Sequence, residues 1–482
     1  MHILGPVEEG RFKNFAAGAA RLLILCLLPC CSADSGGPGA PETGAAPGRP
    51  PNFVIVLTDD QGYGDLGAYG AADIRTPHLD RMAGEGLRFT NFYMAGPVCT
   101  PSRAGLLTGC YPKRVCLHQG VLWPNQAIGL NPREVTIAEI LKGRGYATAC
   151  VGKWHLGRPA ELLPTRQGFD TYFGVPYSND MTPESLMSLL GGNFPPLPLM
   201  RDEQVVEAGV DNDTLTERYT AEALRFIRQN RERPFFLYLA HNMPHYPCGA
   251  SEPFRDTQVT PAHRGIYASA VEEVDWGMGQ ILAALRELGL DRNTLVVFTS
   301  DNGPWKTART LYHEPTGSAR PLRGWKSQTW EGGMRVPAIV WWPGRLPAGV
   351  ECDRLATALD LLPTLAARAG AELPEGPEHR IDGLDISVLL ENPGAASPHQ
   401  YFYYYDSDTG LLEAVRDAEG WKLHVRKDLD RVRKLYYLPG DEGESVNVYS
   451  EHRDVVARLE RASEDFDREI AENQRPVGES NP

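Results

Sequence analysis

Short, strongly apolar runs alternate along this chain with amphipathic stretches, and the alternation continues for roughly 300 residues. The clearest runs cover residues 53–57, 146–151, 234–240, 294–300 and 335–342. Runs this short, and this rich in Val, Ile, Leu and Phe, predict strands that are buried on both faces. Between them, apolar residues recur at helical spacing over residues 77–85, 134–142, 214–229, 266–288 and 357–369. The alternation predicts an α/β fold in which a large, mostly parallel sheet is sandwiched by helices.

The pattern changes at about residue 395. Short strands joined by turns are expected over residues 401–405, 411–416, 421–425 and 435–438, and a charged helix follows from about Asp454. Short strands followed by one helix predict a small antiparallel sheet with a helix against it. We therefore divide the folded part into a large α/β domain over residues 51–394 and a smaller C-terminal α+β subdomain over residues 395–482.

The N-terminus has the layout of an export signal. Basic residues precede a short apolar run over residues 22–28, and small residues follow it. This order is typical of a signal peptide, which we place at residues 1–31, and the Gly/Pro/Ala-rich stretch 32–50 predicts a flexible linker. Cys30 or Cys31 could instead carry a lipid anchor, as in bacterial lipoproteins. We therefore expect an exported protein that is periplasmic, lipid-anchored or secreted.

The charge balance excludes some partners. The chain has 48 Lys and Arg residues against 62 Asp and Glu residues, which gives a formal net charge of −14 at pH 7. Such a chain is unsuited to nucleic acid or to an anionic membrane surface. No internal apolar run reaches the length of a membrane span. An anionic substrate would therefore depend on cations gathered locally, and a membrane contact on the lipid anchor alone.

Polar side chains follow the predicted strands at the point where each strand ends. Four of the apolar runs lead into such residues, namely Asp59 and Asp60, Lys153 and His155, His241 and His245, and Asp301 and Asn302. Because the carboxyl ends of parallel strands lie at one edge of a sheet and form its ligand crevice, we expect these side chains to meet. A single pair of this kind is common in a solvated turn, whereas four pairs at one edge indicate a site.

The residue types gathered there indicate a chemistry. Asp59, Asp60, Asp301 and Asn302 all present oxygen donors, which suit Ca²⁺ or Mg²⁺ and disfavour zinc. The remaining groups are cations, or can become cations: Arg103, Lys153, His155, His245 and Lys326. Groups of this kind bind a tetrahedral dianion or its transition state. The inventory therefore favours a sulfate or phosphate ester as substrate.

The stretch Pro-Val-Cys-Thr-Pro-Ser-Arg-Ala-Gly-Leu-Leu-Thr-Gly over residues 97–109 predicts a helix start. Thr100 can cap the helix, the proline after it suits the first helical position, and Gly109 can end it. Cys99 then lies just ahead of the helix N-terminus, where free backbone N–H groups favour an anion or a thiolate, and Arg103 lies one turn in. A small buried cysteine ahead of an ordinary helix is the alternative.

This stretch resembles the Cys-x-Pro-x-Arg signature of the type I sulfatases, which belong to the alkaline phosphatase superfamily, and further motifs from Asn52 to about Pro337 are similar to the pattern of that family. The resemblance implies an alkaline-phosphatase-like fold. It also implies that a maturation enzyme converts Cys99 to formylglycine, whose hydrated aldehyde is the nucleophile. The metal, usually Ca²⁺, would be bound by Asp59, Asp60, Asp301, Asn302 and the modified Cys99.

The same resemblance implies roles for the remaining candidates. Arg103 and Lys153 would hold the aldehyde hydrate and the sulfate, and His155 would be the base that breaks down the sulfated intermediate. His245 and Lys326 would bind sulfate and assist the leaving oxygen. Ser178, in Pro-Tyr-Ser-Asn-Asp, corresponds to a further sulfate-site residue.

Three other functions stay open from the residues alone. A phosphodiesterase or phosphonate hydrolase of the same superfamily would use nearly the same charges. A non-catalytic binder of sulfated glycans would not need Cys99, and an unmodified cysteine hydrolase would use that thiol together with a histidine. The expected substrate is a sulfated carbohydrate or an aryl sulfate, because the nearby loops carry aromatic residues beside cations: Trp305, Arg309, His313, Arg320, Arg323 and Trp325.

The sequence leaves the structure of two local features open. Outside the leader there are too few cysteines for a disulfide framework, so Cys110 and Cys116 form either one local bridge or two free thiols. Residues 181–211 contain Pro and Gly without clear periodicity. A loop of that length predicts a lid or a specificity element.

Overall fold

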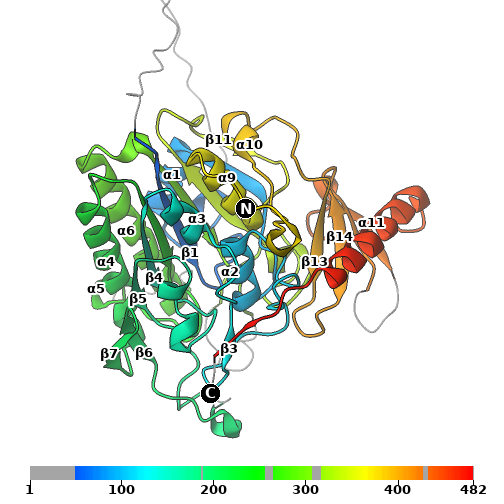
Figure 1. Ribbon diagram of the computed structural model, residues 1–482. Coiled ribbons are helices and arrows are strands. Elements are labelled where there is room, and N and C mark those ends of the chain that lie inside the picture. Colours follow the sequence, from blue (N-terminus) through cyan, green and yellow to red (C-terminus); the bar gives the residue numbers. More distant parts are fainter. Residues whose placement is uncertain (1–48, 186–187, 256–263, 307–315, 427–432, 481–482) are drawn as a thin grey trace, which may run out of the picture. The chain divides into compact units, whose positions relative to one another are not determined.

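In the computed structural model, the described part of the chain is residues 49–482 without 186–187, 256–263, 307–315, 427–432 and 481–482 (Figure 1). The predicted signal peptide and most of the predicted linker lie outside these residues. Two of the predicted rim residues, Arg309 and His313, lie outside them as well. The described residues from Arg49 onward form one compact unit.

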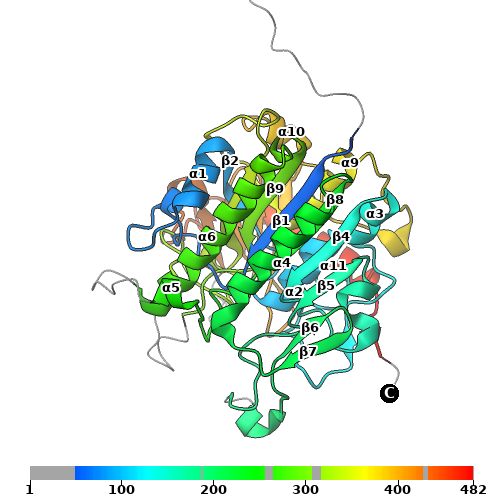
Figure 2. The same cartoon turned by 90° about the vertical axis from the view of Figure 1, so that its left-hand side faces the viewer.

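An eleven-stranded sheet organises this unit, in the order β11-β2-β10-β9-β1-β8-β4-β5-β6-β7 with β12 paired to β2. Its centre consists of four neighbouring parallel strands: β9 (Thr294–Ser300), β1 (Asn52–Thr58), β8 (Phe235–Ala240) and β4 (Ala147–Gly152). The next strand, β5 (Thr171–Gly174), continues the parallel array (Figure 2). The predicted α/β fold with a mostly parallel sheet is therefore confirmed.

Helices cover both faces of this sheet. On one face lie α1 (Pro77–Glu85), α4 (Leu215–Gln229) and α6 (Gly265–Glu287), and both α1 and α4 contact α6 (Figure 2). The helices α2 (Cys99–Thr108), α3 (Ile137–Gly143) and α9 (Leu361–Arg368) form a second mutually contacting group. Strand β1 serves both cores, because alternate side chains of a strand point to opposite faces.

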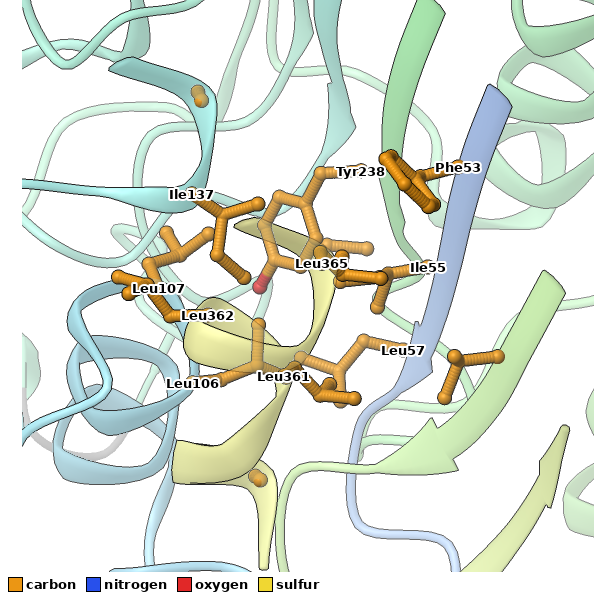
Figure 3. Close-up of a cluster of buried hydrophobic side chains, with 14 of the residues drawn as sticks. Phe53, Ile55, Leu57, Leu106, Leu107, Ile137, Tyr238, Leu361, Leu362 and Leu365 are labelled. Carbon is orange, nitrogen blue, oxygen red and sulfur yellow. The ribbon is translucent and has the colours of Figure 1, made fainter. Parts of the chain in front are cut away.

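The second core shows this alternation directly. Phe53, Ile55 and Leu57 pack with Leu106 of α2 and Leu362 of α9 in one buried cluster (Figure 3). The intervening residues of β1, Val54 and Val56, belong instead to the cluster that includes side chains of α4 and α6. The two cores fix the strand ends from both sides, so the residues that follow each strand start from rigid positions.

Several predicted boundaries are corrected by the structure. A strand that the pattern did not predict, β2 (Leu87–Tyr93), pairs antiparallel with β10 (Arg335–Trp341). Helix α3 begins three residues later than expected, because Thr136 caps it in a reciprocal capping box with Glu139. The expected long loop over residues 181–211 includes an antiparallel hairpin, β6 (Pro198–Arg201) and β7 (Gln204–Ala208).

The C-terminal part contains the predicted small antiparallel sheet. Its four strands are β13 (Tyr401–Tyr405), β14 (Leu412–Asp417), β15 (Trp421–His424) and β16 (Lys434–Tyr437). The closing helix α11 (Arg453–Glu472) packs against β14 and β15. Beyond it, β17 (Gly478–Glu479) pairs with β3 (Ile128–Gly129). Among the described residues, no helix has the length and apolar character that crossing a membrane requires.

Candidate active site

The predicted site residues follow the carboxyl ends of adjacent parallel strands. Asp301 and Asn302 follow β9, Asp59 and Asp60 follow β1, His245 comes after β8, and Lys153 and His155 follow β4. Beyond β5 lies Ser178. All of these side chains are buried. The sheet therefore brings together groups that are separated by more than 200 positions in the sequence, as shown by the contact of Asp60 with Asn302.

Helix α2 presents Cys99 to this edge. The helix begins at Cys99 itself with Val98 as its N-cap, so the predicted capping role of Thr100 is wrong. The hydroxyl of Thr100 instead donates to the carbonyl oxygen of His155 at 3.0 Å and accepts from the backbone N–H of Leu122 at 3.1 Å. The predicted end of the helix is confirmed, since Gly109 adopts a left-handed φ of 66°.

Three cations hold the carboxylates around Cys99. The Sγ of Cys99 lies 3.5 Å from Oδ1 of Asp59, whose other oxygen accepts from Nζ of Lys153 at 2.6 Å and from Nη2 of Arg103 at 3.2 Å. Arg103 also donates to Oδ2 of Asp301, from Nε at 3.1 Å and from Nη2 at 2.9 Å. A separate pair joins Nζ of Lys326 to Oδ1 of Asp60 at 2.7 Å.

The charged groups of this cluster shift one another's pKa values strongly. Burial raises the pKa of Asp59, but Lys153 and the other nearby cations outweigh it and hold the pKa well below its ordinary value. Burial and the neighbouring Asp59 carboxylate raise the pKa of Asp301 to about 7, in spite of Arg103. Carboxylates this close repel one another in a dry site, and a divalent cation between them would relieve the repulsion.

The donor set fits a metal ion. Asp59, Asp60, Cys99 and His245 each offer one ligand atom, and these atoms lie within 4.8 Å of one another. Asn302 donates from its amide nitrogen to Asp60 at 2.8 Å, whereas its Oδ1 is buried and has no hydrogen-bond partner in the described part of the chain. An orphaned amide oxygen beside carboxylates is the ligand type that hard divalent cations prefer.

The two histidines differ in which nitrogen is available. In His155, Nε2 lies 3.0 Å from the carbonyl oxygen of Leu122, so Nε2 must carry the proton. Its Nδ1 is buried and has no partner among the described side chains and backbone. Burial, followed by the charges of Lys153 and Arg103, lowers the pKa of His155 well below its ordinary value. This imidazole is therefore neutral at neutral pH, with a free lone pair on Nδ1.

In His245, Nδ1 lies 2.5 Å from the carbonyl oxygen of Tyr246, and Nε2 lies 3.5 Å from Oδ2 of Asp60. Burial and the charge of Lys326 lower the pKa of His245. Its ring stacks at an interplanar angle of 9° on the indole of Trp305, with ring centroids 6.3 Å apart. Nε2 of His245 therefore faces the same carboxylate as Lys326 does.

The comparison with known proteins decides which family the chain belongs to. The family model described as "Sulfatase" matches residues 51–371, which is more than half of the chain. The chain belongs to the sulfatase family. It is an enzyme of sulfate ester hydrolysis, and the resemblance of its motifs to that family is confirmed.

Individual sulfatases match most of the chain. Arylsulfatase A of Homo sapiens is 43% identical over 423 residues, which cover 84% of this chain and 78% of that protein. N-acetylgalactosamine-6-sulfatase of Canis lupus familiaris is 39% identical over 488 residues, with 90% and 87% covered. A solved structure, Ps i-CgsB in complex with k-i-k-neocarrahexaose, matches with a TM-score of 0.76 at 30% identity, over 88% of this sulfatase and 94% of that chain.

The thiols of this sulfatase do not behave as the sequence suggested. Burial and the Asp59 carboxylate raise the pKa of Cys99, so the environment opposes a thiolate in spite of the helix N-terminus. Cys110 and Cys116 are both free thiols, which excludes the local bridge between them in this structure. Sγ of Cys110 accepts from Arg475 at 3.2 Å instead.

Two groups next to the predicted site residues were not singled out from the sequence. Gln61 directly follows the two aspartates and is buried, and neither atom of its amide has a hydrogen-bond partner within the described residues. Its place in the motif was a usable signal. The carbonyl of Leu122, which orients His155, was not predictable, because any residue type supplies a carbonyl. Asp60 and His155 adopt left-handed φ values of 63° and 58°, an uncommon backbone conformation for residues other than glycine.

Proposed function

We propose that this sulfatase hydrolyses a sulfate monoester through a formylglycine made from Cys99, together with one Ca²⁺ ion. The observation that carries the proposal is the setting of Cys99 at the N-terminus of α2. Its Sγ lies 3.5 Å from Asp59, and Lys153 bridges that carboxylate to Ser178. Because burial and Asp59 raise the pKa of the Cys99 thiol, the unmodified side chain is a poor nucleophile at this position.

The proposed reaction needs two groups besides the side chains described here, namely formylglycine at position 99 and Ca²⁺. Formylglycine would supply a hydrated aldehyde, of which one oxygen attacks sulfur and the other remains for deprotonation. Ca²⁺, held by Asp59, Asp60, Asp301, Asn302 and residue 99, would supply positive charge beside the sulfate oxygens. The orphaned Oδ1 of Asn302 and the raised pKa of Asp301, caused by burial and by Asp59, support a cation there.

The chain's own cations are arranged to bind the sulfate group. Nζ of Lys153 lies 3.0 Å from the hydroxyl of Ser178, so the two can present donors to the same anion. Arg103 is fully buried and is held by Asp59, Asp301 and the carbonyl of Lys153, to which Nη1 donates at 2.8 Å. Fixed donors of this kind stabilise the charge that develops in the transition state without having to reorganise.

His155 is suited to act as the general base. Its Nε2–H is fixed on the carbonyl of Leu122 at 3.0 Å, and its Nδ1 has no partner among the described groups. Because burial and nearby cations lower its pKa, the ring stays neutral and can accept a proton at Nδ1. His245 and Lys326 both lie against the carboxylate of Asp60, where they would bind sulfate and assist the leaving oxygen.

A sulfated carbohydrate or an aryl sulfate is the substrate class that we propose. The indole of Trp305 stacks on His245, and Trp325, which is partly exposed, precedes Lys326. An aromatic surface beside cations suits the ring of a sugar or a phenol. The names of the relatives, an arylsulfatase and an N-acetylgalactosamine-6-sulfatase, support the same two classes.

Export completes the proposal. The leader at residues 1–31 would direct the chain out of the cytoplasm to a periplasmic, lipid-anchored or secreted location, with residues 32–50 as the linker. A formylglycine-generating enzyme is then a required partner. We keep the division into a catalytic domain over residues 51–394 and a C-terminal subdomain over residues 395–482 as part of this proposal.

Parallel turnover of 4-nitrophenyl sulfate and 4-nitrophenyl phosphate tests the proposed function. We expect the sulfate to be hydrolysed with a kcat/KM at least about 100-fold above that of the phosphate, because discrimination between esters requires differential binding in the transition state. We also expect turnover to survive treatment with iodoacetamide. Preference for the phosphate would favour a phosphodiesterase, inactivation by iodoacetamide would favour a cysteine hydrolase, and glycan binding without any turnover would favour a non-catalytic binder.

A further inference from the structure

Lys326 lies on a loop whose backbone is hydrogen-bonded to segments that lead into or out of the active site. The N–H of Lys326 donates to the carbonyl of Pro304 at 3.1 Å, two residues after the metal-site Asn302. The N–H of Ser327 donates to the carbonyl of Pro97 at 2.8 Å, in the segment that leads into Cys99. Ser327 has a left-handed φ of 70°, so the chain turns sharply at this point.

The same loop is also hydrogen-bonded to two residues of the C-terminal part, Lys422 and Glu444. Nζ of Lys422, on β15, donates to the carbonyl of Thr329 at 2.9 Å, three residues after Lys326. Glu444, which follows β16, accepts from the N–H of Glu331 at 2.7 Å. The backbone carbonyl of Glu444 accepts from Nη1 of Arg323 at 2.9 Å, three residues before Lys326. The two C-terminal residues therefore hold the loop on both sides of Lys326.

These C-terminal groups form a buried charged network. Nζ of Lys422 lies 2.9 Å from Glu331 and 3.0 Å from Glu444, and none of the three side chains is exposed to solvent. Burial raises the pKa of Glu444 to about 7 in spite of Lys422, and Lys422 and the other nearby cations outweigh burial to lower the pKa of Glu331 to about 2. Burying charges to this degree costs free energy, and removal of one partner leaves an uncompensated charge. We therefore expect such a removal to displace the backbone that the network holds.

We propose that Lys422 and Glu444 are positioning residues for Lys326: the C-terminal sheet fixes the loop over residues 323–331 so that the ammonium of Lys326 stays on Asp60 and faces the sulfate group. The inference rests on the proposed role of Lys326 in binding the substrate. Neither Lys422 nor Glu444 touches Asp60, Cys99 or a histidine of the site by any contact found among the described residues, so both act through the loop.

A double-mutant cycle between Lys422 and Lys326 tests this proposal. We compare kcat and KM for 4-nitrophenyl sulfate in the wild type, Lys422→Met, Lys326→Ala and the double variant. We expect Lys326→Ala to lower kcat/KM about 100-fold, and Lys422→Met to lower it about 10-fold through misplacement of the loop. In the Lys326→Ala background, Lys422→Met should change kcat/KM by less than about twofold, since its effect passes through Lys326.

The other outcomes of this cycle would contradict either the positioning role of Lys422 or the proposed role of Lys326. If the two losses multiply, or if Lys422→Met leaves turnover unchanged, the positioning role is wrong although the proposed function stands. If Lys326→Ala itself leaves turnover unchanged, the proposed role of Lys326 fails first. Glu444→Gln, which keeps the volume and removes an acceptor oxygen, provides the same cycle if Lys422→Met does not fold.

Arg458→Met is the matched control for this cycle. Arg458, on α11, pairs with Asp417 of β14 at 2.6 Å, and no contact between this pair and the Lys326 loop is found among the described residues. The variant therefore perturbs the same C-terminal sheet without touching the loop. We expect its kcat/KM to stay within about twofold of the wild type. A loss as large as that of Lys422→Met would show that general loosening of the sheet is sufficient, which would overturn the specific role.

Discussion

Two buried charged clusters in this molecule look alike in composition and differ in how completely they are bonded. One is the site around Asp59, Asp60 and Asp301, and the other is the Glu331 cluster, which we define as Glu331, Arg416, Lys422, His424 and Glu444. Every side chain in both clusters is buried. Each cluster contains a carboxyl whose pKa burial raises to about 7: Asp301 in the site and Glu444 in the Glu331 cluster. Burial, charge and a raised pKa therefore do not distinguish them.

The bonding of the oxygen atoms does distinguish them. In the Glu331 cluster, both oxygens of Glu331 accept hydrogen bonds, from Tyr404, Lys422 and Tyr93, and both oxygens of Glu444 accept as well. In the site, the amide oxygen of Asn302 has no hydrogen-bond partner in the described structure. Since buried oxygen atoms are nearly always satisfied, this orphaned oxygen supports the proposal that the site, and not the Glu331 cluster, binds a metal ion.

The largest expected effect is on turnover, in the site. Cys99→Ala should lower kcat for 4-nitrophenyl sulfate by about 10⁴-fold or more, because the nucleophile is lost. The fold should persist, since the only side-chain hydrogen bond of Cys99 found in the described residues is the one to Asp59. Cys352→Ala is the control, because Cys352 is a buried free thiol that donates to the carbonyl of Pro393 and not to a carboxylate of the site. Comparable turnover in both variants would contradict the assignment of residue 99.

In the Glu331 cluster, we expect a substitution of Glu331 to act mainly on stability and not on turnover. Glu331→Gln removes one of the two carboxyl partners of the buried Lys422, so we expect the free energy of unfolding to fall by about 3–5 kcal/mol. Chemical denaturation monitored by tryptophan fluorescence measures this loss. The corresponding loss for Cys99→Ala should be about 1 kcal/mol. If Cys99→Ala were the more destabilising of the two, the distinction between a bonded support and an open site would be wrong.

Metal removal sharpens the comparison, because it should act on the site alone. Dialysis against EDTA should abolish turnover and lower the free energy of unfolding by about 2.7 kcal/mol relative to protein at 100 times the dissociation constant of the ion. Addition of Ca²⁺ should restore both. Unchanged thermal unfolding after chelation, with full activity, would exclude a metal at Asp59, Asp60, Asp301 and Asn302.

A smaller effect is expected in the pH dependence of the metal-free protein. Burial and Asp59 raise the pKa of Asp301 to about 7 in the folded state, above its ordinary value of 3.8. The folded state therefore binds this proton more tightly than the unfolded state does, so its contribution to stability is present at low pH and is lost as the pH rises toward 7. Asp301→Asn should flatten that decline between pH 4 and 7. Parallel curves for the variant and the wild type would contradict the assignment.

The sequence predicted the site better than it predicted the support behind it. The central strands are short apolar runs, and each ends abruptly in polar residues, so Asp59, Lys153 and Asp301 could be placed at one sheet edge. Lys422 gave no such signal. A lysine on a short strand is normally solvated, whereas this one is buried against Glu444 and against the loop that carries Thr329 and Glu331, about 90 residues earlier. Contacts of this kind depend on tertiary packing and leave no local pattern.

The mass of the tryptic peptide over residues 89–103 tests the central claim most directly, because residue 99 is its only cysteine. The protein should be isolated from a host that carries the maturation enzyme. We predict a peptide whose mass is that of formylglycine at position 99, and whose aldehyde reacts with a hydrazide probe. A peptide that carries only the unmodified thiol, in a preparation that hydrolyses 4-nitrophenyl sulfate, would contradict the account.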